Sequence, residues 1–262
     1  MINWRRLFGL ALKDFFDGLY YEVELEKNLT IQEQYLDIVI IRKSVGNPPK
    51  TLPDGLENLS YHNLLTYKSL REPLDKWTLD ELVGYYTIYR KQVSPDPKKL
   101  LPVEQFKLYA VCTRKPQWLN HYKAKKQIKD GVYEVETFTG SIRIIITSQI
   151  AQSDANAILQ LFSGKAEGFR FGETHYQWRR PRSRGLLKQL FEMYFKEDIV
   201  MSYTWEDFER DYAREHLHLL SPKDVVEQFS PKEVLGQFSP KEVLGQFSPE
   251  AIEKYLAKLK KP

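Results

Sequence analysis

The chain has 262 residues, 42% of them hydrophobic, and a formal net charge of +4. This length and hydrophobic content indicate one large folded domain, or one domain with an appendage, and argue against a largely disordered chain. The single cysteine, Cys112, excludes an intrachain disulfide and a cysteine-based zinc site, and its apolar surroundings "LYAVC" predict a buried thiol. No apolar run approaches the roughly 20 residues of a membrane helix, so we expect a soluble, cytoplasmic protein with no membrane partner.

Hydrophobic periodicity predicts one helix and three strands in the first 70 residues. Apolar residues at helical spacing indicate a helix over 4–18, and the alternating "YYEVELEKNL" predicts a strand over 20–28 with one solvated face. The more continuous "QYLDIVIIRK" is typical of a central strand, and "HNLLTYKSL" predicts a third one. The intervening segment 44–58, rich in Pro and Gly, is expected to be a loop.

Helices and strands continue to alternate after this point. "WTLDELVGYYTIYRKQ" predicts a second helix, in which Thr78 and Glu81 have the spacing of a capping box. "FKLYAVCTR", "GVYEVETF" and "SIRIIITSQI" predict three more strands, and "DANAILQLFS", "RGLLKQLFEMYFKE" and "TWEDFERDYAREHLHLL" predict helices. The pattern favours an α/β fold with a mixed sheet flanked by helices.

From Leu220 the sequence repeats every nine residues, as "LSPKDVVEQ", "FSPKEVLGQ", "FSPKEVLGQ" and "FSPEAIEKY". Ser is placed as an N-cap, Pro in the first turn, and the acid of the first three units closes a capping box. We therefore expect an array of very short helices, which either stack as a spacer or form an oligomerisation or partner element. The predicted parts are residues 1–200, a connecting helix over 201–219, and a repeat tail over 220–262.

Asp37 on the second strand and Lys68 at the end of the third are candidate catalytic residues. Carboxylates on adjacent strands can hold Mg²⁺, while a nearby lysine orients the attacking water. Positions 66 and 68 of a strand face the same side, so an acid at position 66 would share the metal with Asp37. This chain has Thr66 there.

The stretch from "YLDIVI" through "NLLTYKS" to "LDELVGYYTIYRKQ" resembles the PD-(D/E)XK nuclease superfamily. Within it, the chain is similar to the recombination-promoting nuclease and putative transposase group, whose cyanobacterial relatives tend to carry tails with Ser-Pro-Glu-type repeats. The resemblance implies a restriction-endonuclease-like αβββαβ core and DNA cleavage dependent on Mg²⁺ or Mn²⁺. Asp37 matches the metal ligand and Lys68 the lysine of the motif, whereas Thr66 departs from it. Glu24 on the first strand, as a second metal ligand, or Glu81 on the following helix would replace the missing acid.

Structural roles compete with these functional ones. Asp37 has the position of a strand-end hydrogen-bonding residue, Lys68 can extend its stem along the sheet with its charge in water, and the glutamates of the first strand can form a solvated face. The alternative hypothesis is a catalytically inactive nucleic-acid-binding or scaffolding protein that self-associates through residues 220–262.

Two basic segments are candidate contacts for DNA. "YQWRRPRSRG" precedes an apolar helix, and arginine suits phosphate at a helix N-terminus. The residues predicted to hold phosphates are Arg179, Arg180, Arg182 and Arg184; the alternative is a solvated loop that pairs with the acidic "EDFERD". The second run, "HYKAKKQIK" at 121–129, allows the same two interpretations.

Overall fold

The computed structural model describes residues 4–28, 35–42, 46–47, 49–96, 98–180, 185–197, 210, 214, 217 and 221–259. The chain divides into two compact units, Met1–Met201 and Ser202–Pro262. Most of the predicted connecting helix, 201–219, and both Arg182 and Arg184 lie outside the described residues.

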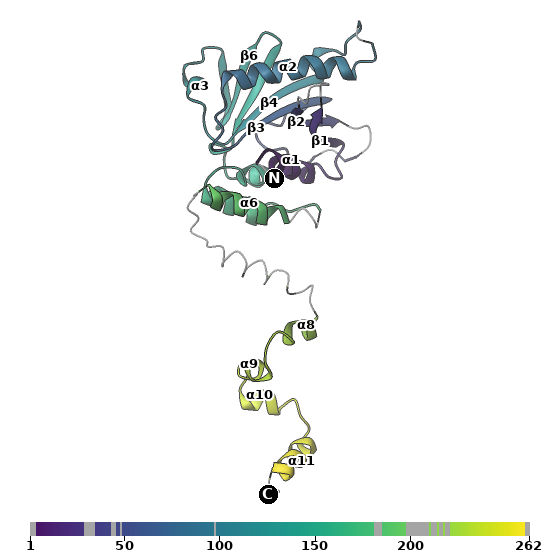
Figure 1. Ribbon diagram of the computed structural model, residues 1–262, viewed down its shortest axis with the longest axis vertical. Coiled ribbons are helices and arrows are strands. Elements are labelled where there is room, and N and C mark those ends of the chain that lie inside the picture. Colours follow the sequence, from purple (N-terminus) through teal and green to yellow (C-terminus); the bar gives the residue numbers. More distant parts are fainter. Residues whose placement is uncertain are drawn as a thin grey trace. The chain divides into compact units, whose positions relative to one another are not determined.

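The first unit is an α/β fold with a seven-stranded mixed sheet flanked by helices (Figure 1). It begins with α1 (Trp4–Phe15), β1 (Tyr21–Asn28), β2 (Tyr35–Arg42), β3 (His62–Lys68), α2 (Lys76–Val93) and β4 (Phe106–Cys112). It continues with α3 (Gln117–His121), β5 (Lys125–Lys129), β6 (Val132–Thr137), β7 (Gly140–Ile146), α4 (Ala157–Gln160), α5 (Ala166–His175) and α6 (Gly185–Lys196). The predicted fold class is confirmed, and the first six elements follow the predicted αβββαβ order.

The strands lie in the order β1-β2-β3-β4-β7-β6-β5. β3, β4 and β7 are parallel neighbours, and the other pairs are antiparallel. The parallel pairing of β3 with β4 requires a crossover, and α2 provides it. The carboxyl ends of β3 and β4 therefore lie at the same edge of the sheet.

Alternation along β3 assigns the two faces of the sheet. Leu64 belongs to the buried cluster that contains the α2 residues Leu82 and Tyr86. Tyr67 points to the opposite face, where its ring stacks on Phe8 of α1 with centroids 4.4 Å apart. Since side chains alternate between faces, positions 62, 64, 66 and 68 face α2, and so do the positions opposite them on β2.

Two local predictions were wrong, and two elements were not predicted. α2 begins at Lys76, because Asp75 is its N-cap and accepts a hydrogen bond from the Thr78 backbone N–H at 2.8 Å. Thr78 is therefore not the cap, and Glu81 does not close a capping box. α1 ends at Phe15, before residue 18, and the segments that form β5 and α5 were not predicted as elements.

The second unit contains the predicted run of short helices. These are α8 (Pro222–Val226), α9 (Pro231–Leu235), α10 (Pro240–Leu244) and α11 (Pro249–Leu259). Ser230 and Ser239 cap α9 and α10, and Glu233 and Glu242 close both capping boxes. The local chemistry of the repeat thus determines where each helix begins.

The apolar side chains of the repeats remain open. Phe229, Phe238 and Phe247 are 55%, 54% and 57% exposed, and Leu235 and Leu244 are also exposed. The second unit therefore presents the same apolar group to solvent every nine residues.

Cys112 is buried, as predicted, and burial raises the pKa of its thiol to about 12. Among the described helices, none combines the length and apolar character needed to cross a membrane.

Candidate active site at the end of β3

The strand register places Asp37 beside Thr66. Ile38 pairs with Leu65, so Asp37 and Thr66 form the next opposing pair, and both face α2. Lys68 follows two residues later on the same face of β3. The predicted Asp37–Lys68 layout therefore occurs at the carboxyl end of β3, where ligands commonly bind in open α/β sheets.

Thr66, which stands where the motif has an acid, forms a hydrogen bond with Asp37. Its hydroxyl donates to Asp37 Oδ2 at 2.9 Å, and the backbone N–H of Tyr67 donates to the same oxygen at 3.1 Å. Within the described part of the chain, no hydrogen bond reaches Asp37 Oδ1. Asp37 is half-buried, so its carboxylate is oriented by the neighbouring strand and keeps one oxygen available.

Lys68 is also half-buried, and its ammonium has no hydrogen bond or ion pair with any residue that the structure describes. The positive charge of Lys68 lowers the pKa of Asp75. The pKa of Asp75 lies below its usual value, first because the Thr78 hydroxyl and N–H donate to it and further because of the positive charge of Lys68. Lys68 thus combines a desolvated stem with an unpaired charge beside the start of α2.

The negative charges of Glu81 and Asp37 both act on Tyr85 of α2. Burial raises the pKa of Tyr85, and the negative charges of Glu81 and Asp37 raise it further. Tyr85 stands four residues after Glu81, on the same side of α2. Without a capping role, Glu81 is available as an acid. The sequence interpretation missed Tyr85, for which the spacing from Glu81 was the only available signal.

Glu24 lies on the same face of the sheet as Asp37, but nearer the amino end of β3. It pairs across the strands with Val39, one same-face row away from Asp37, and its Oε2 forms an ion pair with Lys27 Nζ at 2.7 Å. Its charge acts on His62 and Tyr89, opposing the burial that lowers the pKa of His62. His62 begins β3 and Tyr89 is hydrogen-bonded to it, so the charge of Glu24 acts at the end of β3 opposite Lys68.

The donor set fits a weak Mg²⁺ or Mn²⁺ site and not a preformed cage. Among the described residues, no three His, Cys, Asp or Glu side chains are grouped so that they could hold a metal. Mg²⁺ in phosphoryl chemistry is often held by one or two carboxylates, with water and substrate phosphate completing its shell. Asp37 Oδ1 would be one such ligand, and the negative charge of Glu81 acts on the same Tyr85 phenol as that of Asp37.

Arg179 and Arg180 are tied to the end of α1. Their backbone N–H groups donate to the buried carboxylate of Asp14 at 3.0 and 2.9 Å. The Arg180 guanidinium pairs with Asp17, and Arg179 lies 5.8 Å from the ring centroid of Phe15. Both arginines are engaged within the protein, so binding of phosphate by them stays a prediction.

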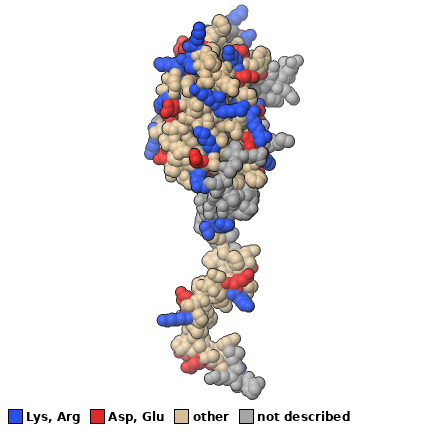
Figure 2. Space-filling model, turned by 90° about the vertical axis from the view of Figure 1, so that its left-hand side faces the viewer, with Lys and Arg blue, Asp and Glu red and all other residues tan. Residues whose placement is uncertain are grey.

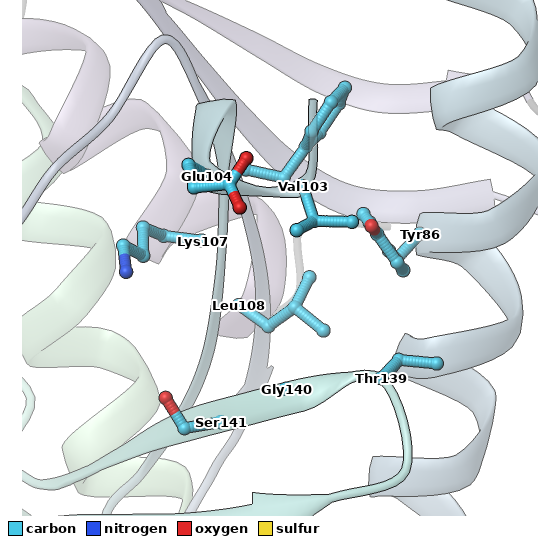
Figure 3. Close-up of a pocket in the computed structure, with 9 residues that line it drawn as sticks. Tyr86, Val103, Glu104, Lys107, Leu108, Thr139, Gly140 and Ser141 are labelled. Atoms are coloured by element: carbon cyan, nitrogen blue, oxygen red, sulfur yellow. The ribbon is translucent and has the colours of Figure 1, made fainter. Parts of the chain in front are cut away.

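A cavity of about 260 Å³ lies on the α2 side of the sheet at the opposite end of β4 (Figure 3). Tyr86 of α2, Leu108 of β4 and the hairpin residues Thr139 and Ser141 line it, with Glu104 and Lys107 also in the lining. It contains none of the predicted site residues. Its place at the amino ends of the parallel strands separates it from the Asp37–Lys68 region.

Comparison with known protein families, curated proteins and solved structures found no match to this chain.

Proposed function

We propose that this protein is a Mg²⁺- or Mn²⁺-dependent DNA endonuclease of the PD-(D/E)XK type in which the second acid is displaced from β3. The observation that carries the proposal is the half-buried Asp37 beside the half-buried Lys68 on the next strand. Among the described residues, neither Asp37 Oδ1 nor the Lys68 ammonium has a hydrogen-bonding partner. Metal-assisted hydrolysis of a phosphodiester uses side chains that hold the metal, and a cationic group near the attacked phosphate adds further stabilisation of the developing negative charge.

Each residue of the candidate site has a separate role in the proposed reaction. Asp37 offers Oδ1 to the metal while Thr66 and the Tyr67 N–H hold Oδ2 in place. Glu81 supplies the second negative charge from α2. Lys68 orients the attacking water or contacts the phosphate, and it can do so because no described acidic side chain neutralises its ammonium. A bound divalent ion would stabilise the negative charge that develops on the phosphate.

Nicking of supercoiled plasmid in Mg²⁺ or Mn²⁺ tests the proposal. Lys68→Ala is expected to slow nicking by about 10²- to 10⁴-fold, the usual contribution of a positioned catalytic group. Lys107→Ala is the matched control, because Lys107 is a half-buried sheet lysine that lines the cavity at the other end of β4. Absence of metal-dependent cleavage of single- and double-stranded DNA, or equal rates for Lys68→Ala and wild type, would refute the activity.

A second candidate function is a catalytically inactive nucleic-acid-binding or scaffolding protein that self-associates through its repeats. The specific observations in its favour are the Thr66 hydroxyl in place of an acid and the open apolar side chains of the repeats. Light scattering of the full chain and of a chain lacking 220–262 tests it. A monomer in both cases removes the claim of self-association.

A further inference from the structure

Aromatic and basic side chains gather where α2 begins, beside α3. Trp77 is 68% exposed and makes no ring contact with another described residue. The neighbouring Lys76 ammonium lies 6.0 Å from the ring centroid of Tyr122, and that ring packs edge-on against Trp118. The Trp118 indole donates to the Leu74 carbonyl at 2.8 Å. This bond ties the segment before α2 to α3, so Trp77 projects from a rigid support.

The segment 113–129, which contains α3 and β5, is basic. It contains six Lys and Arg residues and no Asp or Glu. Lys125 donates to the Leu119 and Asn120 carbonyls and thereby holds the end of α3 against β5, whereas Lys123 and Lys126 are exposed. Figure 2 shows the side of the molecule on which α3 lies, with Lys and Arg spread across the globular unit.

This surface borders the candidate active site. Asp75 immediately precedes Lys76, and the charge of Lys68 acts on it. Asp75 is exposed, and one of its carboxylate oxygens accepts hydrogen bonds from both the N–H and the hydroxyl of Thr78. The exposed indole of Trp77 therefore lies two residues from Asp75, whose pKa is lowered in part by the charge of Lys68.

We infer that the aromatic–basic surface formed by Trp77, Lys76, Tyr122 and Lys123 binds single-stranded nucleic acid beside the end of β3. An exposed indole stacks on an unpaired base without regard to its sequence, and lysines beside it neutralise the backbone phosphates. Bases in a duplex already stack on one another and cannot use such a platform. Binding of the single strand does not depend on the proposed nuclease function. Cleavage of the bound strand does, and in that case the inference identifies the substrate of the nuclease as single-stranded.

Fluorescence anisotropy of a labelled oligothymidylate of about 12 nucleotides, a length within the usual site size, tests the inference. The full chain is used in EDTA, so that binding is measured without hydrolysis. Trp77→Ala is expected to weaken binding by about 5- to 150-fold, as loss of one stacked base predicts, while Trp77→Phe retains most of the affinity. Phe195→Ala is the matched control, because Phe195 is 72% exposed on α6.

The role of the lysines is tested by the salt dependence of binding. Lys76→Ala and Lys123→Ala should each reduce the magnitude of the slope of log affinity against log salt concentration by about 0.7, the value for one phosphate contact on a single strand. Lys91→Ala, on the exposed end of α2, should leave the slope unchanged. Equal affinity of wild type and Trp77→Ala, equal affinity for a duplex, or no binding at all would overturn the inference. Trp77-dependent binding without any cleavage refutes only the nuclease, and Asp37-dependent cleavage with Trp77-independent binding refutes only the platform.

Discussion

Replacement of Asp14 by Ala is expected to destabilise the first unit by about 3–4 kcal/mol. Asp14 is 1% exposed, and its carboxylate accepts hydrogen bonds from the Tyr176 hydroxyl and from the backbone N–H groups of Arg179 and Arg180. A hydrogen bond to a charged group contributes about 1.5–3 kcal/mol. We reduce this to about 1–1.5 kcal/mol for each bond, because water can reach the two exposed arginine positions after the change.

Urea unfolding followed by tryptophan fluorescence measures this effect, with the free energy of unfolding taken by linear extrapolation. The signal reports mainly on the first unit, since four of the five tryptophans lie within it. Asp17→Ala is the control: Asp17 also pairs with Arg180, but its side chain is 34% exposed, and an exposed ion pair contributes under about 1 kcal/mol. Equal destabilisation by the two substitutions would refute the role assigned to Asp14.

Three further outcomes are expected. Cys112, with its pKa raised to about 12, should react with a thiol reagent at pH 8 only after unfolding in urea, and rapid reaction of the native protein would contradict its burial. Thr66→Glu should tighten Mn²⁺ binding by about tenfold, because a second carboxylate would stand beside Asp37; a titration showing unchanged affinity would rule out this geometry. If the repeats associate through their exposed apolar side chains, replacement of Phe229, Phe238 and Phe247 together by Ser should lower the mass measured by light scattering. Phe138→Ser, at a fully exposed position of the first unit, should leave the mass unchanged.

Periodicity alone was sufficient to place Asp37 and Lys68, because alternation on two strong apolar strands determines which side chains share a face. The sequence could not predict whether Glu24 or Glu81 is the better candidate for the second acid. It depends on the register of β1 with β2 and on the residue that caps α2. A capping box at Thr78 fits the spacing rule, but Asp75 lies one turn earlier and provides a charged acceptor for the same helix.

The missed elements have physical reasons. β5, "KKQIK", is an edge strand whose lysines protect an open edge and hide the alternation of a half-buried strand. α5 contains Gly168 and Gly172, which suggest a turn. Gly172 is required there by close packing, since a Cβ at that position would lie 2.6 Å from the Ala157 carbonyl oxygen of α4. Such contacts between helices leave no periodic signal in the chain.

Mn²⁺ binding by calorimetry, for wild type and Asp37→Ala side by side, tests the central claim most directly. The variant removes the carboxylate while Thr66 and the strand around it remain. Weak binding by the wild-type protein that disappears in Asp37→Ala is the expected result and would establish a metal site at the end of β3. Absence of binding in both proteins, or equal binding by both, would contradict the claim that Asp37 holds a catalytic metal.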